Sequence, residues 1–219
     1  MSVVIIKKNK NKILSEIKKN TPIIIFKKFF NENDCKKIIS ICHNNYTFKN
    51  NRKKFKNKYI KFASTDVLPS NVRTNRIFRT FELSNYFINK FKTIKDLLNF
   101  QNKVIKNEKK KKIYRKVQVI HYPVGGGFFE EHKHPRNPTN YGFIITLSKK
   151  KKDFKEGVTN FKINKKNLSL EKFDVTKGDL ILFKFDLPHS ITPCDPNKNL
   201  TFDTKGRWTM VLPVYHEKF

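Results

Sequence analysis

Three histidines, two glutamates and three glycines stand within the short stretch HYPVGGGFFEEHKHP, residues 121–135. His132 and His134 are two positions apart, so on a β-strand both side chains would point to the same face. Two imidazoles on one face make a pair of metal ligands, and imidazole binds iron, zinc, copper and nickel. The later segment GDLILFKFDLPHSITP offers a third ligand, His189, at the end of an expected apolar strand. Three ligands would leave positions open for a substrate or oxygen.

The other histidines carry weaker signals. His43 and His216 lie in polar surroundings, which predicts surface residues. His121 would lie on the strand face opposite that of Tyr122, which fits a hydrogen-bonded core histidine. Because a His-x-His pair alone is a weak indication of a metal site, its context in the chain has to decide.

The composition is that of a folded chain. Hydrophobic residues make up 37% and aromatic residues 13% of 219 positions, which argues against disorder and fits one domain over residues 1–219. The three cysteines include no CxxC pair, so we expect no disulfide framework. Cys35 and Cys42 fall on a helical apolar stripe, which predicts buried thiols. The apolar run in MSVVIIKKNK is too short for a signal peptide, and no run could span a bilayer, so we expect a cytoplasmic protein.

The formal net charge of +30 is compatible with binding to nucleic acid. Nearly all of this excess is lysine, grouped in short runs such as KKNKNK, KNEKKKKIYRK and SKKKK at expected turns and termini. Runs of this kind are usually solvated surface. We therefore expect no nucleic-acid partner, although a basic module that binds nucleic acid without catalysis remains an alternative.

The first half of the chain reads as supporting structure. TPIIIFKKFF (21–30) is typical of a strand, and a helix is expected to follow it, capped by Asn31 or Asn33. A second helix is expected over 83–100, whereas STDVLPSNVRTN (64–75) indicates a loop.

From about residue 113 the chain consists of short β-rich runs separated by turn residues, which indicates a sandwich or barrel. We predict an α+β protein, with a strand and helix support region over 1–112 and a β core over 113–219.

Four pieces of this second half resemble, in order, the catalytic core of the iron(II)- and 2-oxoglutarate-dependent dioxygenases, in the prolyl-hydroxylase-like branch. They are YPVGGGFFEEHKH, EGVTNF, GDLILF followed by LPHSITP, and GRWTMVLPVY. The resemblance implies a double-stranded β-helix, or jelly-roll core, with the N-terminal helices packed on it. It also implies oxidation with Fe(II), O₂ and the cosubstrate 2-oxoglutarate, hydroxylating an unactivated C–H bond and releasing succinate and CO₂.

The same resemblance assigns roles to single residues. His132 and His189 would bind the iron, and Arg207 would pair with the far carboxylate of 2-oxoglutarate, which suits its planar fork. Thr209, two residues after Arg207, and Tyr122, ten residues before His132, would also contact the cosubstrate.

One position departs from the family pattern, which has His-x-Asp or His-x-Glu. His134 stands where the carboxylate is expected. It is either the third ligand or no ligand, or else Glu130 replaces it; we favour His134 as the ligand. A neutral triad should hold Fe(II) less tightly.

The substrate is not determined by the sequence, and a small molecule or a peptide is expected. Arg136 and Asn137 follow the metal segment and would contact a substrate, or they form only a Pro-rich turn. The arginines of NVRTNRIFRTFEL belong either to a substrate lid or to structural ion pairs. A cupin-type metal protein, which would use three histidines without 2-oxoglutarate, is the main alternative. The Glu that the cupin motif places after its His-x-His pair is missing.

Overall fold

The structure is a computed structural model that describes residues 3–9, 11–44, 46–49, 52–55, 64–69, 73–79, 113–115, 118–134, 141–211 and 214–216. Most of its elements are short β-strands. In chain order they are β1 (Val3–Ile6), α1 (Asn11–Lys18), β2 (Ile23–Phe26), α2 (Glu32–Asn44), β3 (Tyr46–Lys49), β4 (Arg52–Phe55), β5 (Ser64–Pro69), β6 (Arg73–Arg79), β7 (Ile113–Arg115), β8 (Gln118–Tyr122), β9 (Gly127–His132), β10 (Tyr141–Thr146), β11 (Thr159–Ile163), β12 (Lys166–Ser169), the 3-10 helix η1 (Leu170–Phe173), β13 (Leu180–Lys184), β14 (His189–Cys194), β15 (Arg207–Val211) and β16 (Val214–His216).

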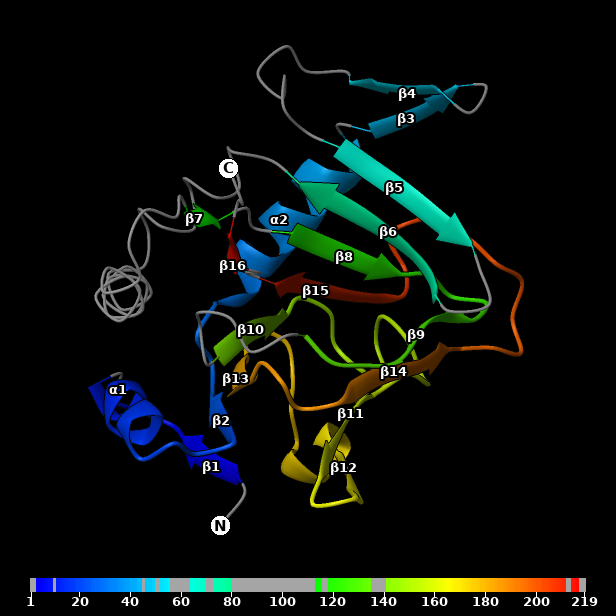
Figure 1. The fold of residues 1–219 in the computed structure, drawn as a ribbon. Helices are drawn as coiled ribbons and strands as arrows, with labels where there is room; N and C mark the ends of the chain where they lie inside the picture. Colours follow the sequence, from blue (N-terminus) through cyan, green and yellow to red (C-terminus); the bar gives the residue numbers. More distant parts are fainter. Residues whose placement is uncertain are drawn as a thin grey trace.

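Twelve of the strands form one sheet (Figure 1). Its order is β1-β2-β13-β10-β15-β8-β6-β9-β14-β11-β12, and β5 pairs with β6 outside this path. The sheet curls so that distant strands face each other. Arg207 of β15 donates a hydrogen bond to Thr159 of β11, and the rings of Phe161 on β11 and Phe183 on β13 lie 5.1 Å apart. The described chain is thus mostly β-sheet with two helices, an architecture compatible with a jelly roll.

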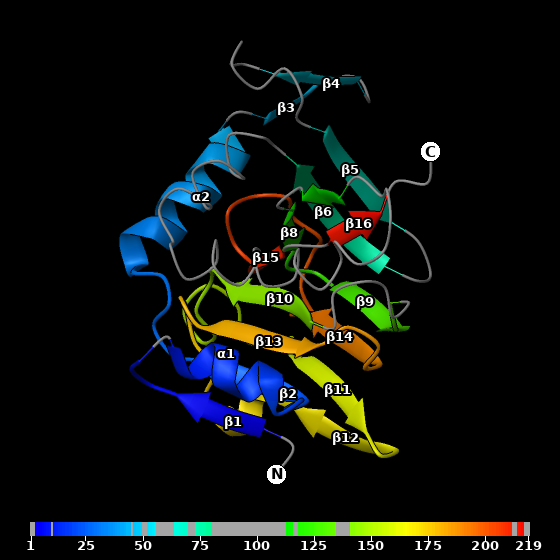
Figure 2. The ribbon, with the colours of Figure 1, turned by 60° about the vertical axis from the view of Figure 1, so that its left-hand side comes forward.

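Both helices lie on one side of this sheet (Figure 2). Ile13 of α1 and Cys35, Ile38 and Cys42 of α2 are buried in one cluster with Trp208 and other outward-facing strand residues. This confirms the expected buried thiols, and the three cysteines are free. Burial raises the pKa of Cys35 to about 12, which keeps it protonated and unreactive.

Asn31 caps helix α2, as one of the two expected residues. Its side-chain oxygen accepts the backbone N–H of Asp34 at 2.8 Å, and the Asp34 carboxylate accepts the N–H of Asn31 at 3.3 Å. This reciprocal arrangement pairs two N–H groups that would otherwise lack partners. The helix therefore begins where the capping residues stand.

Several expectations about elements are corrected by the structure. The loop expected over 64–75 is wrong, because β5 and β6 form an antiparallel hairpin there. Strand pairing with β8 and β9 stabilises β6 although its sequence is polar. The strand expected over 21–30 is limited to β2, and the helix expected over 83–100 lies outside the described residues. Within the described part of the chain, no helix is long and apolar enough to cross a membrane.

Candidate metal centre and anion site

Three histidine side chains meet where β9 ends and β14 begins. His132, the last residue of β9, pairs in register with His189, the first residue of β14. His134 follows two residues later than His132, and its backbone N–H donates to the carbonyl of Phe185 at 3.3 Å. The three imidazoles offer ligand atoms that all lie within 4.8 Å of one another. One metal ion between them could bind all three.

Hydrogen bonds fix which nitrogen two of these rings present. Nδ1 of His132 lies 2.8 Å from the carbonyl oxygen of Glu130, and Nδ1 of His189 lies 2.9 Å from that of Leu187. A carbonyl oxygen only accepts, so each Nδ1 carries the proton and donates it. The lone pair of each ring is then on Nε2, as in metal-binding histidines whose other nitrogen is held by a carbonyl.

Aromatic rings stack on two of the three imidazoles, and of the three histidines only His189 is buried. Phe129 stacks on His132 with centroids 3.8 Å apart, and Phe185 stacks on His134 at 4.2 Å. Burial, followed by the charge of His132, lowers the pKa of His134 to about 4 and that of His189 to about 3. Both rings are therefore neutral at pH 7, which is the form that binds a metal.

The route by which the histidines meet differs from the expected one. The spacing predicts His132 and His134 on one strand, but β9 ends at His132 and His134 lies in the connection after it. His189 likewise begins β14, whereas an end of the preceding apolar strand was expected. Stacking on Phe185, not strand alternation, brings His134 to the group. Glu130 is exposed and does not belong to it.

Arg207 is the first residue of β15 and lies on the inner face of the curled sheet. It is 5% exposed, its Nη2 donates to the hydroxyl of Thr159, and its Cζ lies 5.4 Å from the ring centroid of Tyr122. Its Nη1 is buried without a hydrogen-bond partner. Burial lowers the pKa of Arg207 from its usual value. A buried guanidinium with an unused donor is suited to an anion. Thr209, two residues on, is also buried.

The register of the strands sets the separation between the two groups. Phe161 of β11 pairs with His189, whereas Thr159, the partner of Arg207, pairs with Ile191. Two residues of strand correspond to about 7 Å. Arg207 thus contacts β11 about 7 Å along the strand from the level of His189.

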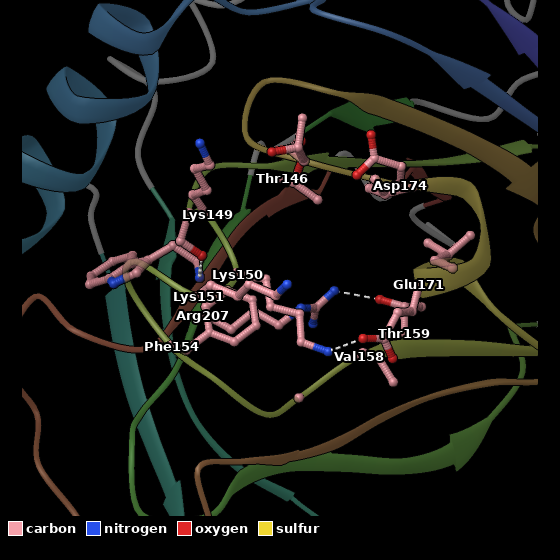
Figure 3. Close-up of a pocket in the computed structure, with 16 residues that line it drawn as sticks. Thr146, Lys149, Lys150, Lys151, Phe154, Val158, Thr159, Glu171, Asp174 and Arg207 are labelled. Carbon is pink, nitrogen blue, oxygen red and sulfur yellow. Dashed lines mark hydrogen bonds and ion pairs between the residues drawn. The ribbon is translucent and has the colours of Figure 1, made fainter.

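A cavity of about 360 Å³ lies beside Arg207 (Figure 3). Arg207 and Thr159 line it together with Lys150 and Glu171, which form an ion pair across it. None of the three histidines lines this cavity. The cavity therefore reaches Arg207 but not the three imidazoles.

His121 is the core histidine that the sequence allowed. It is fully buried, Arg76 donates to its Nδ1, and its Nε2 lies 2.6 Å from the carbonyl oxygen of Lys205. Arg76 is itself 2% exposed, and among the described residues its side chain bonds to His121 and to the carbonyl of Asp203, with no ion pair. His43, expected at the surface, is partly buried, and its Nδ1 has no hydrogen-bond partner.

Sequence reasoning missed Thr159 as the partner of Arg207. The signal was present in the threonine of EGVTNF, a motif that was recognised without giving this residue a role. Arg136 and Asn137, the candidate substrate residues, lie outside the described residues, as does the side chain of His216.

The fold can be compared with solved structures over nearly the whole chain. A prolyl-4-hydroxylase from Pseudomonas putida matches with a TM-score of 0.60 at 11% identity, over 96% of this chain and 100% of the other. The chain has the fold of this prolyl hydroxylase. An oxidoreductase of the 2OG-Fe(II) oxygenase family from Burkholderia pseudomallei matches with a TM-score of 0.57 at 8% identity, over 98% and 96% of the two chains.

A third match is a prolyl hydroxylase from Trichoplax adhaerens in complex with a peptide fragment of the hypoxia inducible factor oxygen degradation domain. Its TM-score is 0.53 at 16% identity, over 93% of this chain and 87% of the other. The resemblance to the prolyl-hydroxylase-like oxygenases is thus confirmed at the level of the fold. No family model matches the sequence, and no curated protein gives a significant match.

Proposed function

We propose that this protein is an Fe(II)- and 2-oxoglutarate-dependent dioxygenase that hydroxylates a C–H bond of a small molecule or a peptide. The observation that carries this proposal is the combination of three convergent histidines with Arg207, a buried guanidinium whose Nη1 has no partner. The solved structures that share its fold include 2-oxoglutarate oxygenases and prolyl hydroxylases, which supports the same assignment.

The histidine group fits an iron ion. His132 and His189 present Nε2 lone pairs held in place by their Nδ1 hydrogen bonds, and the nitrogens of His134 lie within 4.8 Å of both. Three neutral nitrogen ligands suit Fe(II) and leave coordination positions open. The usual carboxylate is replaced by His134, so the bound ion would carry one more net positive charge than in a two-histidine, one-carboxylate site.

The surroundings of Arg207 fit the far carboxylate of 2-oxoglutarate. Thr159 holds the guanidinium through Nη2, which directs the fork and leaves Nη1 for a bidentate or single bond to a carboxylate. Tyr122 and Thr209 lie beside Arg207 on the same face of the sheet. The ring of Tyr122 would form a wall of the cosubstrate site, and Thr209 would offer a hydroxyl to the carboxylate. These residues select a short diacid over a monoacid.

The bound iron, with 2-oxoglutarate and O₂, would supply the oxidising power for C–H hydroxylation, with succinate and CO₂ as products. The protein's own residues orient the imidazole ligands and exclude water from the centre. Phe129 and Phe185 hold the imidazoles of His132 and His134 by stacking, and Phe183, 4.9 Å from His189, helps to keep bulk water out. Exclusion of water protects a reactive centre from side reactions.

The three-histidine set also favours a second candidate, a cupin-like metal protein that does not use 2-oxoglutarate. Such a protein needs the same metal ligands but has no use for a buried arginine with a free donor. Arg207 therefore distinguishes the two candidates.

The deciding experiment is an anaerobic titration of metal-free protein with Fe(II) and then with 2-oxoglutarate. A visible charge-transfer band at about 500 nm is expected for the chelate at an open iron site. The band should be lost in Arg207→Ala, which still binds iron, and should weaken in His134→Ala. His43→Ala, which removes a histidine outside the group, is the matched control and should behave as wild type. Iron binding without any band would reject the dioxygenase and favour the cupin-like candidate.

A further inference from the structure

Asn75, on β6, is a buried amide whose two polar atoms have no hydrogen-bond partner. It is 1% exposed, and neither Oδ1 nor Nδ2 has a partner. Within the part of the chain that the structure describes, four buried side-chain atoms share this condition, and three of them belong to Asn75 and Arg207. Burying an amide without a hydrogen bond is costly, so such a group calls for an explanation.

On the outer face of the adjacent strands β6, β8 and β15, three residues pair in one row across the strands. Arg76 of β6 pairs with His121 of β8, and His121 pairs with Trp208 of β15. Their side chains are in contact: Arg76 donates to His121, and His121 stacks on Trp208 with centroids 4.1 Å apart. This row packs under the helices, away from the interior.

On the inner face of the sheet lie the residues next to this row, displaced by one position along each strand. Tyr122 pairs with Arg207, and the two side chains are in contact. Side chains alternate along a strand, so Asn75 points to the face opposite Arg76, the face on which Ile77 packs with Tyr122. The pairing of β6 with β8 ends at Arg76 and His121. Continuing that antiparallel register by one residue brings Asn75 beside Tyr122, which pairs with Arg207.

We propose that Asn75 is a further binding residue for the ligand held by Arg207, with its Nδ2 donating to the far carboxylate of the cosubstrate. The identity of this ligand rests on the proposed function. Arg207 and Asn75 flank Tyr122 in one row, so an anion over the tyrosine ring would face the unused Nη1 from one side and the amide from the other. Both buried donors would then gain the acceptor that they lack.

The test compares stability with binding in Asn75→Leu. Leucine fills the amide's space without polar atoms, so the thermal midpoint of the metal-free protein should stay the same or rise. The dissociation constant for 2-oxoglutarate, read anaerobically from the chelate band of the Fe(II)-loaded protein, should rise about tenfold or more, because a hydrogen bond to a charged group is lost. Asn75→Asp is the second variant; its carboxylate repels that of the ligand and should weaken binding further.

Gln118→Leu is the matched control, because Gln118 is a buried amide of the same chemistry at the other end of β8. It should leave the dissociation constant unchanged. The proposal is overturned if Asn75→Leu lowers the thermal midpoint and keeps wild-type binding, since the amide would then serve the fold through bound water. A wild-type protein that forms no chelate band would instead reject the proposed function.

Discussion

The ring of Phe185 lies flat on the imidazole of His134, with centroids 4.2 Å and planes 13° apart. Gly142 makes room for this ring, because a Cβ atom at that position would lie 2.7 Å from Cδ2 of Phe185. Gly142 is on β10, in register with Phe183 of β13. The absence of a side chain at Gly142 therefore leaves the space in which Phe185 lies against His134, a candidate metal ligand.

Gly142→Ala should weaken metal binding without removing a ligand. The added methyl group displaces Phe185, and the imidazole of His134 loses the surface that orients it. Disturbing such supporting contacts typically lowers metal affinity by about tenfold or more. The measurement is anaerobic titration with Fe(II). Phe185→Leu should have a similar effect, and the double variant should lose less than the sum, since both changes act on one ring. Wild-type affinity in Gly142→Ala would contradict this.

His134→Asp should bind Fe(II) more tightly than wild type, because it restores an anionic ligand in place of a neutral one. His134→Ala should bind less tightly, because a ligand is lost. Equilibrium titration under argon gives both affinities. If the alanine variant equals wild type, His134 is not a ligand, and the site has two histidines only.

Thr159→Val should damage both stability and cosubstrate binding. Valine keeps the shape of threonine but leaves Nη2 of Arg207 without its acceptor, and an unpaired buried donor costs about 1–3 kcal/mol. Urea unfolding measures the first effect, and the 2-oxoglutarate titration measures the second. Thr159→Ser keeps the hydroxyl and should retain most of the binding. Equal losses in both variants would show that the methyl group, not the hydrogen bond, matters.

The histidine and arginine candidates could be chosen from the sequence because each stands in a segment that resembles a motif of the oxygenase family. Asn31 as a cap and the buried thiols Cys35 and Cys42 were equally visible, since both depend on neighbours within a few positions. The contact of Gly142 with Phe185 was not visible, because only the pairing of β10 with β13 brings these residues together.

The hairpin of β5 and β6 escaped prediction for a related reason. Its sequence contains Pro69 and several polar residues, which favour a loop when only local preference is considered. β5 lies outside the main path of the sheet, so it needs no alternating apolar pattern. In β6, the charged Arg76 is buried because His121 and aromatic rings satisfy it. Tertiary contacts here outweigh local preference.

The metal-free protein should lose stability as the pH falls from 7 to 5. Burial lowers the pKa of His121 well below its usual value, and those of His189 and His134 to about 3 and 4. In the unfolded chain these rings titrate near 6.5, so below that pH the unfolded state binds more protons. Each ring that stays neutral contributes up to about 1.4 kcal/mol per pH unit, and the partly exposed His134 contributes less.

Urea unfolding at pH 7, 6 and 5 measures this slope. The variant that combines His134→Ala and His189→Ala should show a clearly shallower dependence, with His121 and the less buried His43, whose pKa burial also lowers, supplying what remains. An unchanged slope in that variant would mean that the two rings are not held neutral in the folded protein.

Arg76→Lys should destabilise the fold although it preserves the charge. The planar guanidinium donates to Nδ1 of His121 at 2.9 and 2.7 Å and to the carbonyl of Asp203 at 2.9 Å, and its Cζ lies 5.5 Å from the ring centroid of Trp208. A lysine ammonium has neither this fork nor this flat face. The free energy of unfolding should fall by about 1–3 kcal/mol, because buried acceptors on His121 and Asp203 lose their donors.

Arg76→Met separates geometry from charge, because methionine keeps part of the apolar stem and removes both the donors and the charge. If the fork is what matters, the lysine and methionine variants should lose similar amounts in urea unfolding. A lysine variant as stable as wild type would show that a positive charge beside His121 suffices. In that case the two hydrogen bonds from Arg76 to Nδ1 of His121 would not be needed to hold Arg76, His121 and Trp208 together on the outer face of the sheet.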